Sequence, residues 1–348
     1  MIESWIIRQI NLPNIYYIIL DGYGRGDILR DVYHYDNDEI YNYLVDNDFY
    51  LAPSSNSNYA ITSLSLASSL NLEYLDWASA PRFSSSENTQ PVFPSLKNNK
   101  LVEFLNEMGY YTISFDTGYT PIEPRNYDQF HPSISNLTPF WNGIINLTPL
   151  RYWLFRYQYR THHKRINYIF DNLPAANDTE QPYFVFAHII SPHPPFVFKS
   201  NGDVNYLDIE FNLNDGSYLT NIKGEDFYIE NYINQLVYVN QRIQEIIQKI
   251  QSNPQNNSII VLQSDHGPAA MLHKSNVHER MGILNAYYFP DQDYSKLYPD
   301  ISPVNSFRVI LDQYLGTDYG LLDDRNYFSL FSRPYDFIDV TDELNQGK

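Results

Sequence analysis

The fold is indicated most clearly by the stretch Asn256-Asn-Ser-Ile-Ile-Val-Leu-Gln-Ser-Asp265-His266-Gly267-Pro268. Its apolar, β-branched run over 259–262 predicts a buried strand, which Gly267-Pro268 ends. A carboxylate and an imidazole then lie side by side at the carboxyl end of a strand, the edge at which open α/β sheets bind ligands. Asp265 and His266 suit a divalent metal such as Zn or Mn. The alternative is a capped strand end with a surface histidine.

The start of the chain repeats this pattern. The stretch Asn14-Ile-Tyr-Tyr-Ile-Ile-Leu20-Asp21-Gly22 is an apolar run followed by a carboxylate and a glycine turn. Because ligands bind at the carboxyl edge of such sheets, two strands that each end in Asp can place both carboxylates at one site. We therefore expect Asp21 and Asp265 to lie together.

A hydroxyl at the start of a helix is the third component. The segment Thr62-Ser-Leu-Ser-Leu-Ala-Ser-Ser-Leu70 predicts a helix with three leucines available for burial. Thr62 lies near its N-terminus, where unpaired N–H groups and the helix dipole favour negative charge. A metal can ionise a hydroxyl placed there, and the helix can hold a phosphate beside it. The alternative role for Thr62 is that of an N-cap.

Composition narrows the class of protein. The chain has 348 residues, of which 43% are hydrophobic, enough for one large α/β domain or two smaller ones. Its net charge of −18 disfavours non-specific binding of nucleic acid or of anionic lipid. There is no cysteine, so disulfides and thiolate metal sites are excluded. No apolar run approaches the roughly 18 residues of a transmembrane helix, and the first residues do not resemble a signal peptide.

The remaining pattern alternates strands and helices. Strands are expected at about 49–52, 110–115, 182–188 and 283–289, and helices at about 38–45, 96–108, 228–251 and 304–314. Residues 121–149 are expected to be an insertion lining the cleft, 201–225 a loop or hairpin, and the acidic tail from Arg333 peripheral. With no repeat and no linker, we predict one α/β domain over residues 1–348 with a largely parallel sheet.

The order of these motifs resembles the alkaline phosphatase/sulfatase superfamily. The motifs are the strand ending in Asp21, Thr62 at a helix start, the stretch Ser191-Pro-His193-Pro-Pro195, and Ser264-Asp-His-Gly267. The chain looks most like the branch of lipoteichoic-acid synthases and phosphoethanolamine transferases, whose nucleophile is a threonine. The resemblance implies an alkaline-phosphatase-like α/β/α sandwich, usually found on the extracytoplasmic face of a membrane. The location and oligomeric state of this chain stay open.

The resemblance also implies roles for individual residues. Asp21, Thr62, Asp265 and His266 would hold one divalent ion, Mn, Zn or Mg. Thr62 would be the nucleophile, in preference to its neighbours Ser57 and Ser63. His193, as in the Pro-His-x-Pro stretch of sulfatases, and one of His273 or His278 would contact the anionic group of the substrate or protonate the leaving group.

Two absences narrow the chemistry. A formylglycine sulfatase needs Cys or Ser in a Cys/Ser-x-Pro-x-Arg motif, and the sole Pro-x-Arg, at Pro149–Arg151, has Leu147 in that position. None of the nine histidines follows an Asp by four residues, so a second site like that of two-zinc phosphatases is not expected. We predict a phosphotransferase or phosphohydrolase for an anionic phosphoester linked to lipid or glycan. The alternatives are a sulfuric-ester hydrolase without formylglycine, or a non-catalytic binding protein with a relict site.

Two further segments are open to interpretation. Residues 151–165 form a basic, aromatic island without acids. It predicts either a core helix with a cationic outer face, which we favour, or a surface that docks peripherally to anionic headgroups or acidic glycan. Asp116, after the strand at 110–115, is a secondary site candidate or, as we favour, a turn-forming residue.

Overall fold

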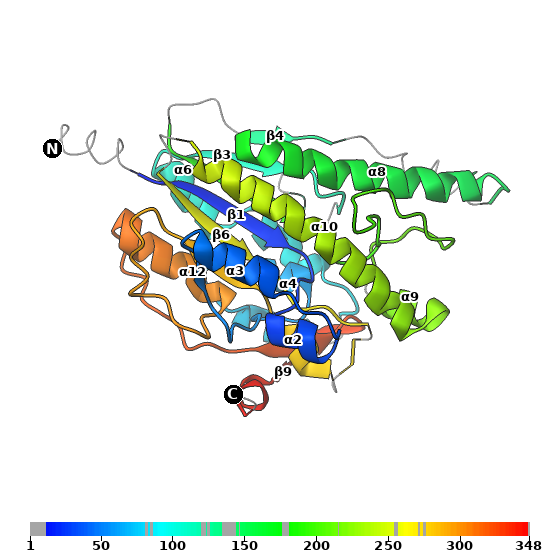
Figure 1. Cartoon of the computed structure of the whole chain (residues 1–348). Coiled ribbons are helices and arrows are strands. Elements are labelled where there is room, and N and C mark those ends of the chain that lie inside the picture. Colours follow the sequence, from blue (N-terminus) through cyan, green and yellow to red (C-terminus); the bar gives the residue numbers. More distant parts are fainter. Residues whose placement is uncertain are drawn as a thin grey trace.

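The computed structural model describes residues 12–80, 83, 86–119, 123, 126–133, 144–145, 147–175, 181–214, 216–253, 257–270, 272–273 and 276–346. Seven strands form the central sheet in the order β2-β7-β6-β1-β5-β3-β4 (Figure 1). Five neighbouring strands are parallel, and β7 and β2 are antiparallel to their neighbours. In sheet order the strands are β2 (Tyr50–Leu51), β7 (Asn285–Tyr288), β6 (Ser258–Gln263), β1 (Asn14–Leu20), β5 (Tyr183–Ile189), β3 (Tyr111–Phe115) and β4 (Gln129–His131). The prediction of a largely parallel sheet is confirmed.

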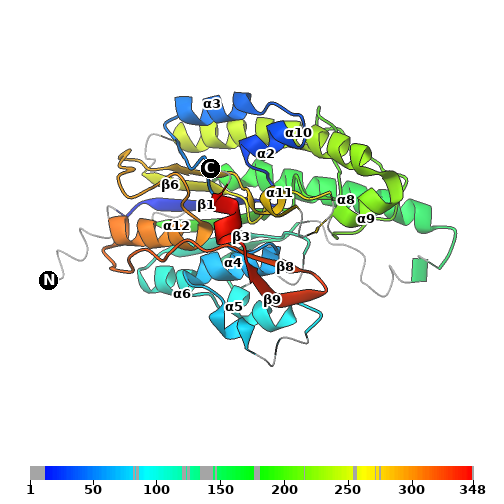
Figure 2. The same ribbon diagram turned by 90° about the horizontal axis from the view of Figure 1, so that it is seen from below.

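Helices cover both faces of the sheet, because the side chains of the central strands are apolar on both sides. Figure 2 shows the two layers above and below the strands. On one face lie α2 (Gly26–Asp31), α3 (Asp38–Asp46), α8 (Arg151–Asn172) and α10 (Glu225–Gln251). On the other lie α4 (Thr62–Asn71), α5 (Phe93–Lys97), α6 (Lys100–Glu107) and α12 (Pro303–Ile310). This is the predicted α/β/α sandwich.

The register of the central strands sets which side chains meet beyond their ends. Ile19 of β1 lies opposite His188 of β5 and Gln263 of β6. Side chains alternate along a strand, so residues two positions further, Asp21 and Asp265, project toward the same face as these three. That face is covered by α4. Two carboxylates, an imidazole and the start of a helix are thereby brought to one end of the sheet.

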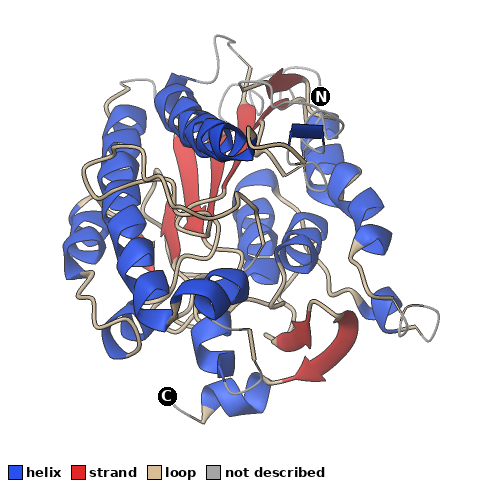
Figure 3. Ribbon diagram, turned by 90° about the vertical axis from the view of Figure 1, so that its right-hand side faces the viewer, coloured by secondary structure: helices blue, strands red, loops and turns tan. Residues whose placement is uncertain are grey.

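A separate two-stranded ribbon closes the chain (Figure 3). It consists of β8 (Tyr327–Leu330) and β9 (Arg333–Asp339), followed by α13 (Thr341–Asn345). The backbone N–H of Tyr327 donates to the carbonyl of Asn58, four residues before α4. Tyr335 is buried at 4% exposure, and it packs in the core beneath α4. The expectation that the tail from Arg333 is merely peripheral is therefore wrong.

Three other expectations are corrected or lie outside the described residues. The segment 201–225, expected as a loop or hairpin, contains helix α9 (Gly216–Lys223). The helix expected over 96–108 is divided into α5 and α6, because the Asn99 side chain accepts from the N–H of Val102 and caps a new start. Most of the proposed cleft insertion at 121–149 lies outside the described residues. In the described part of the chain no helix is long and apolar enough to cross a membrane.

Candidate metal centre and active site

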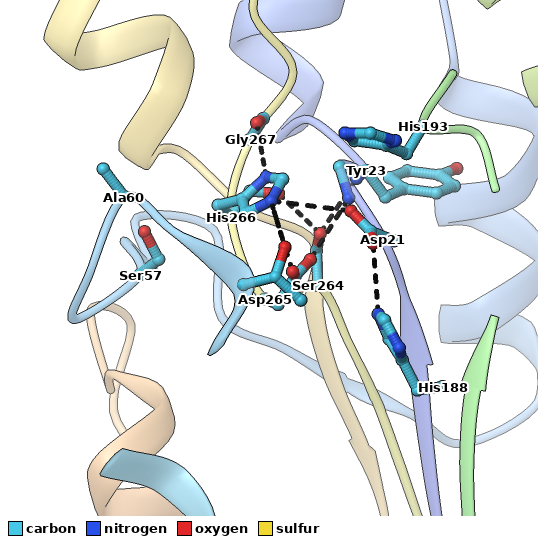
Figure 4. Close-up of polar contacts among 12 residues, drawn as sticks. Asp21, Tyr23, Ser57, Ala60, His188, His193, Ser264, Asp265, His266 and Gly267 are labelled. Atoms are coloured by element: carbon cyan, nitrogen blue, oxygen red, sulfur yellow. Dashed lines mark hydrogen bonds and ion pairs between the residues drawn. The ribbon is translucent and has the colours of Figure 1, made fainter. Parts of the chain in front are cut away.

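Asp21, Asp265 and His266 form a compact buried cluster beyond the ends of β1 and β6 (Figure 4). Each offers one ligand atom, and these atoms lie within 4.8 Å of one another. His266 Nε2 is 3.2 Å from Asp265 Oδ2 and 3.5 Å from Asp21 Oδ1. The expectation that the two strand-end carboxylates lie together agrees with this geometry.

Two glycine turns allow the cluster to form. Gly22 has φ +71°, a left-handed conformation that favours glycine, and its N–H donates to Asp265 Oδ1 at 3.2 Å. Gly267 has no space for a side chain, since an added Cβ would lie 2.1 Å from the carbonyl oxygen of Glu279. The chain can therefore turn sharply after His266, so that adjacent Asp265 and His266 reach the same point rather than opposite faces of a strand.

The hydrogen bonds of His266 assign its tautomer. Its Nδ1 lies 2.9 Å from the carbonyl oxygen of Gly267, which can only accept, so Nδ1 carries the hydrogen. The lone pair of Nε2 then points into the cluster. Asp21 Oδ1 and Asp265 Oδ2 are buried there without a hydrogen-bond partner. Three buried lone-pair donors that converge on one point form an arrangement that fits a divalent cation.

Thr62 completes the cluster from α4, the helix that covers the face toward which Asp21 and Asp265 project. Its Oγ1 lies 2.9 Å from His266 Nε2, and the hydroxyl is the donor because Nε2 bears the lone pair. Thr62 is the first residue of α4, and the carbonyl of Ile61 accepts from the N–H groups of Leu64 and Ser65. The N–H groups of Thr62 and Ser63 have no partner inside the helix and lie at its positive end.

The two competing hydroxyls differ from Thr62 in their surroundings. Ser63 also lines the cavity in front of the cluster, whereas Ser57 is buried with its hydroxyl 3.7 Å from the sulfur of Met281. Among the hydrogen bonds of the described residues, His266 is bonded to the hydroxyl of Thr62 and to neither of these two. The geometry therefore favours Thr62 over both neighbours.

His188 is a member of the site that the sequence did not single out. It is 1% exposed on β5, and its Nε2 lies 3.2 Å from Asp21 Oδ2. Its position opposite Ile19 explains the contact, because both then share the face to which Asp21 projects. Knowledge that β5 pairs with β1 would have predicted the contact between His188 and Asp21, but a single sequence does not reveal which strands pair.

His193 is held at the edge of the same cavity by backbone contacts. Its N–H donates to the carbonyl of Asp21 at 2.9 Å, and its carbonyl accepts from the Gln235 amide at 3.0 Å. Its Nδ1 lies 2.6 Å from the carbonyl of Pro194, so Nδ1 carries a hydrogen. Gln235, fully buried on α10, also accepts from the N–H groups of Val197 and Phe198 and so fixes the whole proline-rich loop.

The two carboxylates of the cluster have pKa values shifted in opposite directions. Burial raises the pKa of Asp21, but the imidazoles of His193 and His188 outweigh burial and hold that pKa below its usual range. Burial, and then the charge of Asp21, raise the pKa of Asp265 to about 6. Burial, and then the charge of Arg280, hold the pKa of His266 well below its usual value. His266 is therefore neutral at pH 7, as metal ligation requires.

Arg280 joins the two halves of the site from behind. It is 2% exposed; its Nε donates to the carbonyl of Ala60 at 2.7 Å, and a terminal nitrogen donates to the carbonyl of Gly267 at 3.2 Å. Ala60 precedes Thr62 by two residues, and Gly267 follows His266. One guanidinium thus fixes the distance between the helix that presents the hydroxyl and the turn that presents the imidazole.

A cavity of about 400 Å³ opens in front of the cluster. The described residues that line it are Asp21, Ile61, Thr62, Ser63, Thr89, Tyr119, Ile190, His193, Leu213, Asn214, Tyr218, His266 and Phe331. His273 and His278 are exposed and are not among these lining residues. Asp116 is not among them either, since it pairs with Arg165 at 3.1 Å and accepts from Gly118 in a turn. Phe331, from the ribbon of β8 and β9, was not expected from the sequence.

Comparison with known proteins places this geometry in a family. The family model for Sulfatase matches residues 13–301. Among curated proteins, none matches the chain by sequence. The C-terminal periplasmic domain of EptC from Escherichia coli, in complex with Zn, superposes with a TM-score of 0.57 at 13% identity, covering 94% of this chain and 92% of that one. A putative sulfatase from Bacteroides thetaiotaomicron superposes with a TM-score of 0.57 at 13% identity, covering 91% and 77%.

A third similar structure is the soluble domain of lipooligosaccharide phosphoethanolamine transferase A from Neisseria meningitidis. It has a TM-score of 0.52 at 12% identity and covers 87% of this chain and 88% of that one. At such identities the superpositions establish the fold alone. Fold and family model together define a sulfatase-like enzyme. The chain belongs to the sulfatase family, because the family model spans well over half of its length.

Proposed function

We propose that this protein is a metal-dependent phosphotransferase or phosphohydrolase in which Thr62 is the nucleophile. The observation that carries the proposal is the position of the Thr62 hydroxyl. It lies 2.9 Å from His266 Nε2, at the positive end of α4, beside two buried carboxylates with unpartnered oxygens. A hydroxyl in this setting can lose its proton and attack an ester, whereas an N-cap would direct its oxygen to the backbone of its own helix.

Asp21, Thr62, Asp265 and His266 are the residues that would hold one divalent cation, Mn, Zn or Mg. The donor set of two carboxylates, an imidazole and a hydroxyl fits such an ion, and the E. coli structure of the same fold is described in complex with Zn. When bound, the cation would lower the pKa of the Thr62 hydroxyl and withdraw charge from the ester oxygens.

The protein's own residues account for the rest of the chemistry. Thr62 Oγ1 releases its proton to solvent water in the cavity and forms a bond to phosphorus, while the bond from phosphorus to the leaving oxygen breaks. The N–H groups at the start of α4 stabilise the phosphoryl oxygens. His193, which lines the same cavity, is placed to contact those oxygens or to protonate the leaving oxygen through Nε2. Attack by water on phosphorus then releases Thr62 and completes hydrolysis, whereas attack by a second alcohol completes a transfer.

The cavity favours a singly charged ester. No lysine or arginine occurs among the described residues that line it, so a bound cation would be the main counter-charge. A phosphodiester carries one negative charge, whereas a phosphomonoester at neutral pH carries nearly two. We infer that a phosphodiester with a lipid or glycan substituent is the preferred substrate.

A sulfuric ester is the second candidate, because it also carries one charge and the family model is that of sulfatases. It would have to be cleaved by Thr62 in place of formylglycine, since the chain has no cysteine and no Cys/Ser-x-Pro-x-Arg motif. We further propose that residues 1–348 act as one catalytic domain on the extracytoplasmic side of a membrane. The E. coli neighbour, which is a periplasmic domain, supports this location.

Turnover of two aryl esters tests the proposal. The protein is stripped with chelator, reloaded with Mn, Zn or Mg, and assayed with an aryl phosphodiester and an aryl sulfate. We expect metal-dependent release of the phenol from the phosphodiester and little from the sulfate. Release from the sulfate alone would establish the second candidate. Full metal binding without turnover of either ester would indicate a binding protein with a relict site.

A further inference from the structure

The amino-terminal end of α8 carries the densest group of exposed apolar side chains in the described structure. Six of the fifteen exposed large hydrophobic residues lie within 14 positions: Ile144, Leu147, Leu150, Tyr152, Trp153 and Tyr157. Leu147 is 88% exposed and Trp153 is 77% exposed. Single exposed apolar residues are ordinary on a protein surface, but a contiguous group marks an interaction site.

The same segment is the most basic part of an acidic protein. Residues 144–165 contain five cations and no acid, in a chain whose net charge is −18. Arg165 is buried against Asp116. The other four are exposed, namely Arg151, Arg156, Arg160 and Lys164. A positive region on a negative molecule orients that region toward an anionic partner during encounter.

The two kinds of side chain are ordered along the helix. Leu150, Trp153 and Tyr157 follow helical spacing and share one stripe, and Arg160 and Lys164 continue it toward the body of the protein. The stripe runs from Leu150 to Lys164, a rise of about 21 Å along the helix. Its outer part is apolar and aromatic, and its inner part is cationic. Figures 1 and 2 both show this end of α8 projecting beyond the rest of the molecule.

We propose that this end of α8, the docking tip formed by residues 147–164, binds the surface of an anionic lipid bilayer. Trp and Tyr prefer the membrane interface, and leucine side chains enter the boundary of the acyl chains. Arginine and lysine set behind them meet the anionic headgroups. An acidic polysaccharide would also attract the cations, but it would leave Leu147 and Leu150 in water, and so it accounts for only half of the surface.

The helix that carries the docking tip packs against the segment that lines the cavity. The inward side of α8 is buried, and the ring of Tyr159 packs edge-on against Phe211, with centroids 5.5 Å apart. His162 contacts the same ring at 5.6 Å. Phe211 lies two residues before Leu213, which lines the cavity together with Asn214 and Tyr218. A bilayer bound to the outward side of α8 would therefore hold the cavity near the lipid surface, where a lipid-linked ester would be found.

Co-sedimentation with vesicles tests the docking tip without reference to catalysis. The full chain is mixed with vesicles of phosphatidylcholine alone or of phosphatidylcholine with phosphatidylglycerol. We expect binding to the anionic vesicles only, weakening steeply between about 0.1 M and 1 M salt as the Debye length falls from about 10 Å to about 3 Å. Each of Arg151→Gln, Arg156→Gln and Arg160→Gln should weaken binding roughly fivefold.

The apolar part is tested separately. The double variant Leu150→Ser, Trp153→Ser should lose at least about tenfold in binding, as expected for side chains withdrawn from an apolar phase. Matched controls are Leu321→Ser, at a residue of 55% exposure elsewhere, and Lys199→Gln, at an exposed lysine outside α8. Both controls should bind like the wild type, and all variants should hydrolyse a soluble aryl ester at the wild-type rate.

Three results would overturn the proposal. The first is no sedimentation with anionic vesicles, or equal sedimentation with neutral ones. The second is binding that the substitutions in α8 leave unchanged while the controls reduce it. The third is capture by an acidic polysaccharide without any binding to vesicles, which would make the surface a glycan-binding one.

Discussion

Replacing Asp265 by Asn is expected to stabilise the metal-free protein while abolishing metal binding. In the metal-free cluster the Asp265 carboxylate faces Asp21 and the lone pair of His266, and its Oδ2 has no hydrogen-bond partner. Asparagine has the same shape, keeps an oxygen for the N–H of Gly22, and offers an N–H₂ group that can donate to His266 Nε2. The substitution removes a repulsive charge and adds a donor.

The magnitude follows from the pKa of Asp265. Burial and the charge of Asp21 raise it from 3.8 to about 6. Roughly two pKa units correspond to about 3 kcal/mol of folding free energy at pH 7. Because the folded-state pKa lies above the unfolded-state pKa, the cost of ionised Asp265 is fully present above about pH 6 and vanishes as the pH falls below 3.8. The stability advantage of the Asp265→Asn variant over the wild type should shrink in the same window.

Urea unfolding of chelator-treated protein at pH 7 and pH 4 measures this effect. A matched control is Asp116→Asn, which should be destabilising. Although burial raises the pKa of Asp116, its hydrogen bonds to Glu123 and Ser133 and the charge of Arg165 outweigh burial and lower that pKa to about 2. Added Mn or Zn should stabilise the wild type and leave Asp265→Asn unchanged. A metal-free Asp265→Asn protein that is less stable than wild type at pH 7 would refute this account of the cluster.

Three further predictions concern the same site. Metal affinity, measured by calorimetry, should fall as the pH drops below about 6, because a proton on Asp265 then competes with the ion; affinity independent of pH between 5 and 7 would contradict the raised pKa. His193→Ala should reduce kcat by about 10²–10⁴-fold with metal content unchanged, and a loss of metal would instead make His193 a ligand. Arg280→Met should cost roughly 1–3 kcal/mol, seen as a lower urea midpoint, because the buried carbonyl of Ala60 loses its donor while that of Gly267 keeps the bond from His266; Arg280→Lys should be intermediate, and a neutral effect would remove the positioning role of Arg280.

The carboxyl ends of the strands were predictable because they obey local rules. An apolar run followed by Asp and Gly marks a strand end wherever it occurs, and parallel strands bring such ends to one edge. Asp21 and Asp265 could therefore be expected together without knowledge of their register. The helix start at Thr62 was equally local, since the apolar spacing of α4 begins there.

The rest of the site depends on pairings between distant segments. His188 reaches Asp21 only because Ile19 lies opposite it, and Gln235 fixes the loop of His193 from a helix whose spacing shows nothing unusual. Arg280 lies in a five-residue helix, α11 (Val277–Met281), that no sequence pattern announced. His278 belongs to that same helix but is exposed. Which polar residue faces inward depends on tertiary packing that one sequence does not encode locally.

Mapping the covalent intermediate tests whether Thr62 is the nucleophile. The metal-loaded protein is mixed with an aryl phosphodiester, quenched in acid within one turnover, digested, and analysed by mass spectrometry. We expect a phosphoryl adduct on Thr62 that is retained in Ser63→Ala and absent in Thr62→Ala. The metal content of Thr62→Ala should remain nearly that of the wild type, because three other ligands persist. An adduct on any other residue, or near-normal turnover by Thr62→Ala, would contradict the claim and favour direct attack by water.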